Sequence, residues 1–492
     1  MNFRNVSRFV IYAMTNIKDL LQPHTRCAAL LQQVSAVAAR RGQEVYVVGG
    51  FVRDLFLQRP LKEVDLMVVG DGIEFAQALA RELGVKKIIP FPKFSTAKIP
   101  CKPLAVEVAA ARKETYQPDS RKPATVRYTD LEGDLLRRDF TINAMAMDIR
   151  PEHFGNLYDP HGGIADLRKQ LLVTPLNPEE TFAEDPLRML RAAYFTSELR
   201  FTLSPGCLTA MVHQAHRITI VSQERITVEF TKILQTPKPS VGLLILQESG
   251  LMRFVFPEIH AMYGLEQTPE WHHKDIFAHT LQVVDNAARL SDKMKIRFAA
   301  LVHDIAKPRT RRIDQRRGYT FYGHDYVGSK MLDQIARRMK LPNELRDYLK
   351  KMTELHLRPI VLAKEGVTDS AVRRLMVAAG DDIDDLMTLC RADITSKNPR
   401  LVQQYMGNFE RVERKMQDVQ ERDAMQAFQS PVRGDVIMRV CGIGEGKLVG
   451  KIKAAIEEAI LGGEIENTYE AAYEYLLTIK DQFLQNRTSH CQ

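Results

Sequence analysis

Two acidic residues, two positions apart, are the first feature of this sequence that could support chemistry. Glu63 and Asp65 stand in the stretch EVDLMVV, whose apolar residues predict a strand over 64–69. Residues i and i+2 of a strand share one face, so both carboxylates would point the same way. Such a pair can bind divalent cations that activate an attacking hydroxyl and neutralise a leaving pyrophosphate. Glu107, in the alternating stretch at 105–108, could supply a third carboxylate.

Acidic pairs on strands more often belong to a solvated face, which is the alternative interpretation of Glu63 and Asp65. The apolar neighbours of Asp65 make that role costly, because an unpaired charge is expensive to place in apolar surroundings.

A glycine pair lies between a predicted strand at 45–48 and a predicted helix. Gly49 and Gly50 would let backbone N–H groups approach a phosphate closely, and Arg53 follows within the helix. A tight turn that needs a positive φ is the more common reason for a bare Gly-Gly. The stretch RRDFTINA adds Arg137, Arg138, Asp139 and Asn143, which could clamp a triphosphate and a ribose. By itself, this stretch also fits a helix start capped by Asp139.

Histidine and aspartate residues recur on predicted helices in the second half of the chain. His279, His303, Asp304 and Asp393 occur in the order His…His-Asp…Asp, and His324 and His356 are additional candidates. Imidazoles and carboxylates on facing helices suit a divalent transition metal that keeps a position open for water. The order resembles the HD superfamily of metal-dependent phosphohydrolases, which implies a phosphoester substrate such as a 2′,3′-cyclic phosphate or a phosphomonoester. A His-Asp pair alone is usually a helix-surface pair.

The elements that must position these residues change character along the chain. The first third mixes strands with helices, including a predicted helix over 72–83 and a polar, proline-containing stretch at 113–122 that we expect to be a mobile loop. Helical periodicity dominates from about residue 178, with a break at 397–399. We therefore expect an α+β head followed by a long helical body.

Two basic stretches have an open interpretation. Residues 307–317 carry six basic side chains against Asp314, which suits contact with RNA phosphates or a solvated loop. The glycine turns at 442–450 and the lysines around them suit an RNA backbone or a helical packing unit.

The composition of the 492 residues fits an ordinary globular protein of about three domains. Lys plus Arg is 69 and Asp plus Glu is 61, so the net charge of +8 permits a nucleic-acid partner without requiring one. Six cysteines without a CxxC pair suit a reducing cytoplasm and argue against a cysteine zinc site. No apolar run of about 18 residues predicts a membrane span.

Taken together and in order, the motifs are far more specific than each alone. GGFVRD at 49–54, EVDLMVVGDG at 63–72, ARKETY at 111–116, RRDFTINAMA at 137–146, EDPLRMLRA at 184–192 and QERI at 223–226 resemble the class II nucleotidyltransferase family. This family contains tRNA CCA-adding enzymes and bacterial poly(A) polymerases. The resemblance covers the chain after about residue 26 and implies a polymerase-β-like head with a small mixed or antiparallel sheet.

The resemblance implies a role for each matching residue. Glu63 and Asp65 match the catalytic metal pair, for which Mg²⁺ is expected. The residues that match nucleotide-binding positions are Gly49, Gly50, Arg53, Arg137, Arg138, Asp139, Asn143, Glu184, Asp185, Arg188 and Arg191. Among these, Glu184, Asp185 and Arg188 match the motif that reads the incoming base. A carboxylate accepts from the amino group of C or A and an arginine donates to ring acceptors, although Glu184 and Arg188 also have the spacing of a helix ion pair.

Two positions depart from the family pattern. Glu63 stands where members normally have Asp, and Tyr194 stands where they commonly have a second Arg. The implied domains are a leader at 1–25, a head at 26–175, a neck at 176–256, an HD-type domain at 257–398 and a helical, RNA-binding tail at 399–492.

The resemblance predicts transfer of CMP or AMP from CTP or ATP to the 3′ end of tRNA. Full CCA addition, A addition and CC addition all remain open. CC-adding relatives tend to lack a loop that is full length here at 112–137, which favours CCA or A addition. The alternatives are a poly(A) polymerase, a phosphohydrolase with an RNA-binding head and a non-catalytic RNA-binding protein.

Overall fold

The computed structural model describes residues 16–101, 104–117, 120–266, 275–316, 318–364, 368–396, 398–427, 430–461 and 464–485. The chain divides into two compact units. The first comprises Met1–Ile360 and Asp381–Gln403, and the second comprises Val361–Gly380 and Gln404–Gln492. Each unit is therefore built from two separate stretches of the chain.

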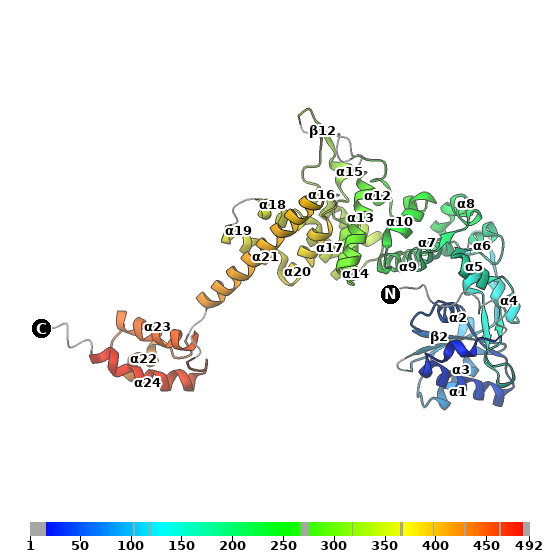
Figure 1. Ribbon diagram of the computed structural model, residues 1–492, viewed down its shortest axis with the longest axis horizontal. Helices are drawn as coiled ribbons and strands as arrows, with labels where there is room; N and C mark the ends of the chain where they lie inside the picture. Colours follow the sequence, from blue (N-terminus) through cyan, green and yellow to red (C-terminus); the bar gives the residue numbers. More distant parts are fainter. Residues whose placement is uncertain are drawn as a thin grey trace. The chain divides into compact units, whose positions relative to one another are not determined.

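A mixed sheet of seven strands forms the centre of the head, in the order β3-β4-β5-β2-β1-β8-β9 (Figure 1). Only β2 and β5 run parallel, and the other neighbours are antiparallel. The strands are β1 (Val45–Val48), β2 (Glu63–Val68), β3 (Ile89–Phe91), β4 (Thr96–Ile99), β5 (Ala105–Ala110), β8 (Ala146–Asp148) and β9 (Leu157–Tyr158). The expected α+β head with a small mixed sheet is confirmed.

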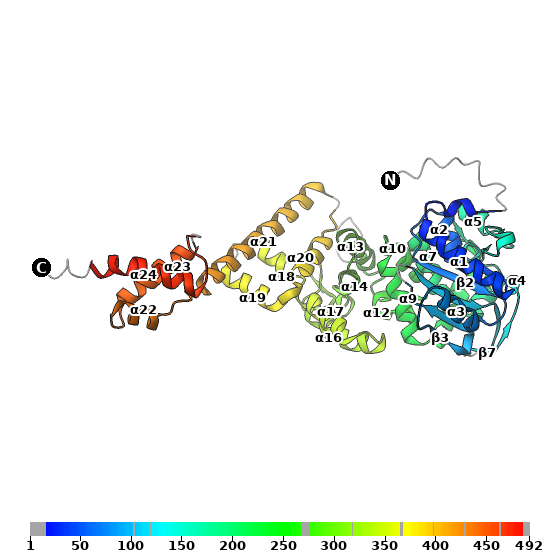
Figure 2. The same cartoon turned by 90° about the horizontal axis from the view of Figure 1, so that it is seen from below.

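The helices of the head cover this sheet and connect its strands (Figure 2). They are α1 (Thr25–Arg41), α2 (Gly50–Phe56), α3 (Gly72–Glu82), α4 (Leu131–Leu136) and α5 (Gly163–Lys169). Asp71 caps α3 by accepting hydrogen bonds from the N–H groups of Ile73 and Glu74. The helix predicted over 72–83 is thus confirmed to within one residue.

The segment before α1 is folded from Asn16 onward. Ile17 is fully buried, its N–H donates to Gly155 O at 2.7 Å, and a short 3₁₀ helix follows at Lys18–Leu21. The described residues of the leader predicted at 1–25 thus pack against the head, where Ile17 and Leu21 are buried. Residues 1–15 lie outside the described part of the chain.

The prediction of a mobile loop at 113–122 is wrong, because the structure has paired strands there. Strands β6 (Arg112–Gln117) and β7 (Ser120–Tyr128) pair as an antiparallel ribbon with register shifts between Thr115 and Gln117. The polar composition of this stretch hid Thr115 and Tyr116, residue types that favour extended backbone, and a two-stranded ribbon tolerates a proline because one edge of each strand is unpaired.

Helices make up most of the first unit beyond the head. They are α6 (Pro178–Glu184), α7 (Leu187–Leu199), α8 (Pro205–Gln214), α9 (Gln223–Gln235), α10 (Pro239–Glu248), α11 (Met252–Val255), α12 (Pro257–His260), α13 (Ile276–Leu290), α14 (Met294–Val302), α15 (Lys307–Thr310), α16 (His324–Arg338), α17 (Asn343–Leu355), α18 (Arg358–Lys364, across the unit boundary) and α20 (Ile383–Ala392). Short two-residue strands, β10 (Leu171–Leu172) and β11 (Thr202–Leu203), pair in parallel, and β12 (Arg312–Asp314) and β13 (Gly318–Thr320) form a hairpin. Phe230, Phe256 and Phe298 pack together with ring centroids 5.8–6.4 Å apart and join α9 to α14.

The second unit contains α19 (Asp369–Ala379), most of α21 (Pro399–Ala427), α22 (Gly434–Cys441), α23 (Lys447–Leu461) and α24 (Tyr469–Gln485). Asp369 on α19 forms ion pairs with Lys415 at 2.8 Å and Arg422 at 2.7 Å, both on α21. Ile437, Ile452 and Leu476 are buried in the core that α22, α23 and α24 share. The predicted break before Pro399 is confirmed. Among the described helices, none is both long enough and apolar enough to cross a membrane.

Candidate active sites

Three carboxylates share one face of the head sheet. In the register of β2 and β5, Glu63 lies opposite Ala105 and Asp65 lies opposite Glu107, so all three acids project from the same side. Lys98 on β4 contacts Glu107 at 2.9 Å. Burial raises the pKa of Asp65 to about 6, with Arg138 opposing the rise and Glu107 adding to it. This oxygen-only, charge-rich set fits a divalent cation, because a cation would compensate the buried carboxylate.

The turn between β1 and α2 brings a guanidinium against the backbone. Gly49 has φ +72°, and a Cβ at this position would lie 2.8 Å from Nη1 of Arg138 and 4.0 Å from Oδ2 of Asp65. The second glycine, Gly50, lies close to Arg53, whose Nη2 would be 3.4 Å from a Cβ at position 50. The turn therefore needs glycine at position 49 both for its backbone conformation and for close approach.

A buried carboxylate holds the two adjacent arginines of the RRDFTINA stretch. Arg137 and Arg138 follow α4, and both contact Asp134, at 2.6 Å and 2.8 Å. Burial opposes ionisation of Asp134, but Arg138 and Arg137 outweigh it and lower its pKa. Asp134 escaped the sequence analysis, although an acid three and four residues before two arginines is a readable helix signal.

A second chain of polar contacts crosses from α2 to α7. Arg53 donates to Oδ1 of Asn143 at 2.8 Å, and Asn143 donates to Asp139 at 3.1 Å. Asp139 also accepts from Arg191 on α7, through Nε at 2.7 Å and Nη2 at 2.6 Å. Arg53 and Arg191 both lie over the ring of Phe195, at 5.2 Å from its centroid. The structure thus brings four of the predicted nucleotide-binding residues into one network.

The motif predicted to read the base lies where α6 meets α7. Asp185 accepts from the N–H of Leu187 at 3.1 Å, and Arg188 is buried, donating to Thr181 O at 3.2 Å and to Arg137 O. Glu184 lies 3.3 Å from Arg188 with its side chain 38% exposed. Asp185 and Arg188 line the cavity, whereas Glu184 is not among its lining residues.

A cavity of about 650 Å³ joins these groups. It is lined by Val48, Gly49, Gly50, Arg53, Glu63, Asp65, Leu66, Met67, Glu107, Ala109, Arg112, Asp134, Arg137, Arg138, Asp139, Asn143, Asp185, Arg188, Arg191, Tyr194, Phe195 and Lys232. Arg112, which the sequence analysis quoted only within a motif, donates to Phe94 O at 3.1 Å and lies over the Phe94 ring. The cavity places cation-binding oxygens beside arginines, as a nucleoside triphosphate requires.

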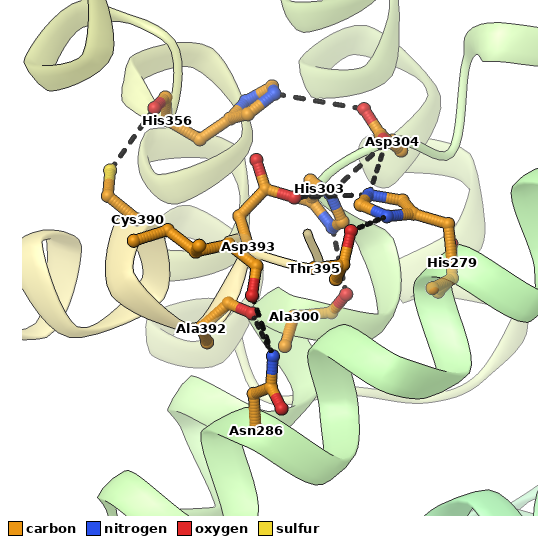
Figure 3. Close-up of polar contacts among 12 residues, drawn as sticks. His279, Asn286, Ala300, His303, Asp304, His356, Cys390, Ala392, Asp393 and Thr395 are labelled. Carbon is orange, nitrogen blue, oxygen red and sulfur yellow. Dashed lines mark hydrogen bonds and ion pairs between the residues drawn. The ribbon is translucent and has the colours of Figure 1, made fainter. Parts of the chain in front are cut away.

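Histidines and aspartates from five parts of the chain meet in a second site (Figure 3). His279 comes from α13, His303 and Asp304 from the end of α14, His324 from α16, His356 from the end of α17 and Asp393 from the end of α20. Two groups of ligand atoms each lie within 4.8 Å, the first from His279, His303 and Asp393 and the second from Asp304, His324 and His356. The four predicted ligands and both additional candidates are thus brought together.

The second nitrogen of each imidazole is fixed by a neighbouring oxygen. Nδ1 of His303 lies 2.9 Å from Ala300 O, that of His324 lies 2.7 Å from Phe321 O, and that of His356 lies 2.7 Å from Thr353 O. Nδ1 of His279 lies 3.1 Å from Oγ1 of Thr395. These contacts orient Nε2 of every ring toward the carboxylates, which is the usual arrangement around a metal ion.

Asp304 belongs to the second group and also contacts the first. Its Oδ2 lies 3.1 Å from Nε2 of His303, and its Oδ1 lies 3.2 Å from Nε2 of His324. Nε2 of His303 and Oδ2 of Asp304 are buried without a well-aligned hydrogen bond. Burial lowers the pKa of His356 to about 4, which leaves its Nε2 lone pair available near neutral pH. Buried and unsatisfied nitrogen and oxygen donors fit a transition metal.

Models of three known families match successive parts of the chain. The poly A polymerase head domain matches residues 45–173, the probable RNA and SrmB-binding site of polymerase A matches 200–263, and the HD domain matches 276–398.

Curated relatives and a solved structure agree with these matches. The chain is 35% identical over 327 residues to the multifunctional CCA protein of Shewanella frigidimarina, covering 64% of this chain and 73% of that protein. It is 34% identical over 368 residues to the multifunctional CCA protein of Vibrio vulnificus, covering 71% and 84%. The crystal structure of the Bacillus stearothermophilus CCA-adding enzyme in complex with CTP superposes with a TM-score of 0.55 at 25% identity, covering 96% of this chain and all of that one.

Replacing Gly49 by alanine tests the turn. Gly49→Ala adds a Cβ against Arg138 at a positive φ, so we expect a loss of about 1–3 kcal/mol of stability and weaker nucleotide binding. Gly42→Ala is the matched control, since Gly42 has φ +58° with nothing within 4 Å of its Cβ position. Urea unfolding and CTP titration measure both effects, and equal nucleotide affinity in the two variants would contradict the close approach.

Replacing Asp134 tests the buried carboxylate. Asp134→Asn removes the negative charge that compensates Arg137 and Arg138, so we expect a loss of about 3 kcal/mol in the free energy of unfolding. The lowered pKa of Asp134 means that its contribution is present above the ordinary value of 3.8 and disappears as pH falls below it. The gap between wild type and variant should therefore hold from neutral pH to about pH 5 and narrow below it. Glu132→Gln, at an exposed position on α4, should change stability little, and a pH-independent gap would contradict the charge argument.

Proposed function

Since the chain belongs to the class II tRNA nucleotidyltransferase family, which includes the CCA-adding enzymes and multifunctional CCA proteins, we propose that its head adds CMP and AMP to the 3′ end of tRNA. The observation that carries this proposal is the single cavity in which Glu63, Asp65 and Glu107 face a set of arginines. CTP and ATP are the proposed donors.

We assign one part of the reaction to the carboxylates of the cavity and another to its arginines. The 3′-hydroxyl oxygen of the tRNA attacks the α-phosphate, the hydroxyl proton is lost, and the bond to the pyrophosphate oxygen breaks. Mg²⁺ bound by Glu63 and Asp65 would supply Lewis acidity for the attacking and leaving oxygens. Arg137 and Arg138 bind the triphosphate, and the network of Asp139 and Asn143 orients the sugar.

Base selection is proposed for Asp185 and Arg188, which line the cavity. Arg188 also donates to the carbonyl of Arg137, so the base-reading helix is tied directly to the triphosphate-binding stretch. Glu184 contacts Arg188 and would adjust its position, since it does not itself line the cavity in this structure.

Extension of three tRNA substrates tests the head. The substrates end before CCA, after C and after CC, and each is incubated with CTP, ATP or both. CMP followed by AMP on the shortest substrate is expected. AMP on the CC-ended substrate alone would indicate an A-adding specialist, and long A tails would indicate a poly(A) polymerase.

Carboxylate variants test the metal pair in the same assay. Asp65→Asn removes a charged ligand, so we expect incorporation to fall about 10³-fold. Glu63→Asp should retain activity within about tenfold because the carboxylate remains, whereas Glu63→Ala should lose it. Glu132→Gln controls for a general loss of charge. Full activity in Asp65→Asn would contradict the assignment.

We further propose that the HD region hydrolyses phosphoesters at RNA 3′ ends. For a 2′,3′-cyclic phosphate, water adds to phosphorus, one ring P–O bond breaks, and the freed ribose oxygen takes a proton. Imidazole-rich ligands favour a transition metal, which would supply an activated water at neutral pH. His279, His303 and Asp393 would hold one transition-metal cation, and Asp304, His324 and His356 would hold a second.

Metal content tests this arrangement independently of activity. We expect about two transition-metal ions per chain after dialysis, and about one in His356→Ala, because the second group of ligands loses a member. His213→Ala is the control, since that imidazole is 62% exposed on α8. Mass spectrometry of the dialysed proteins gives the counts, and an unchanged metal content in His356→Ala would contradict the two-ion proposal.

The remaining assignments are also proposals. We propose the domain limits 26–175, 176–256, 257–398 and 399–492 and an RNA-binding role for the tail, supported by Lys447, Lys451 and Lys453 around α23. A reducing compartment, the cytoplasm, is supported by the free state of Cys27, Cys101, Cys207, Cys390 and Cys441 among the described residues.

A further inference from the structure

The hairpin of β12 and β13 is attached at both ends to the HD site. The chain leaves the metal-ligand cluster at Asp304, forms α15 and the hairpin, and returns at His324. In Figure 1 the hairpin extends away from α15 and α16. A segment rooted between two ligand residues lies at the rim of the site, and anything it binds is held close to the metal ligands.

Contacts near its base hold the hairpin in position. The guanidinium of Arg311 lies 3.8 Å from the ring centroid of Tyr319 on the opposite strand. Lys307 forms an ion pair with Asp304, and its Nζ lies 5.5 Å from the ring centroid of Phe321. The same lysine thus connects the metal-ligand cluster to the residue that follows β13, at the base of the hairpin.

The outer surface of the hairpin is basic and carries exposed side chains with flat or apolar faces. Arg312 and Arg316 are exposed, and neither has an ion-pair partner within the described part of the chain. Ile313 is 80% exposed. Tyr322 and Tyr326, at 70% and 60% exposed, flank the ligand His324 by two residues on either side.

We infer that the hairpin and its two flanking tyrosines form the docking surface for single-stranded RNA whose 3′ end enters the HD site. Exposed arginines suit the phosphates of the strand, and exposed aromatic rings suit unstacked bases. A phosphoester at the strand end is the substrate chemistry that a metal-ligand cluster at the root of the hairpin would process. The inference rests on the proposed phosphohydrolase function of that cluster and adds the surface that binds the RNA strand.

The surface argues for a polymer rather than a free nucleotide. Arg316 lies in the turn of the hairpin, whereas Arg312 pairs with Thr320 at its open end, toward Asp304 and His324, so one mononucleotide in the site would not require Arg316. The hairpin would therefore act on the nucleotides that precede the reacting end.

The test compares two substrates on the full-length, metal-loaded protein. One is 2′,3′-cyclic AMP, and the other is an unstructured oligoribonucleotide of about ten residues ending in a 2′,3′-cyclic phosphate. In Arg312→Ala/Arg316→Ala we expect KM for the oligonucleotide to rise about tenfold, with kcat unchanged, because only strand binding is lost. The dependence of log kcat/KM on log salt should become shallower by about 0.7 for each arginine removed. Tyr322→Ala should raise the same KM without changing the salt slope, since stacking carries no charge.

Controls separate the inference from the function on which it rests. Arg253→Ala removes an exposed arginine from α11 and should leave both substrates unaffected. Absence of turnover of cyclic AMP and of the oligonucleotide by the wild-type protein would contradict the phosphohydrolase function. Turnover of both substrates with no change of the oligonucleotide KM in the arginine and Tyr322 variants would overturn the docking surface alone.

Discussion

The head depends on the neutralisation of charge in places that water does not reach. Asp134 is 1% exposed, yet it holds Arg137 and Arg138, and without it two cations would face each other beside the sheet. Arg138 in turn lies against the turn at Gly49 and beside Asp65. One buried carboxylate therefore fixes the arginines on one side of the cavity, and the three acids of β2 and β5 form the other side. A triphosphate with its bound cations fits between these two sides. The arginines attract the phosphates, and the three carboxylates attract the cations.

The HD site also depends on the neutralisation of buried charge, but here imidazoles and a lysine surround the carboxylate. Asp304 is 2% exposed and lies within 3.5 Å of three imidazoles and a lysine, so its charge is compensated from every side. The carbonyl contacts at Nδ1 of His303, His324 and His356 fix their orientation before any ion binds. Oxygen donors in the head and nitrogen-rich donors in the body would allow the two sites to hold different metals in one chain.

The elements that could be predicted from the sequence are those that depend on patterns of neighbouring residues. Strand β1 and helix α3 were readable because burial periodicity is a local property. The candidate HD ligands, which come from five parts of the chain, were predicted from their order and its resemblance to the HD superfamily. The ribbon at Arg112–Tyr128 was misread because composition, rather than alternation, dominated the interpretation. The pairing of Asp139 with Arg191 and of Arg188 with the carbonyl of Arg137 could not be predicted, since these contacts depend on how α7 packs against the head. A resemblance to known motifs gave the residues a role, but only the structure shows which of them bind one another.

The second unit is built from two separate stretches of the chain, and this affects the order in which parts can fold during synthesis on the ribosome. Helix α19 leaves the ribosome before α21, yet its Asp369 finds Lys415 and Arg422 only there. At about 5–20 residues per second, α19 waits several seconds for its partner. During that interval Asp381–Gln403, which completes the HD site with Asp393, can already fold back onto the first unit. The candidate HD ligands can thus come together in the nascent chain before the second unit is complete, and a truncation before Gln404 would keep these residues while removing the α21 partners of Asp369.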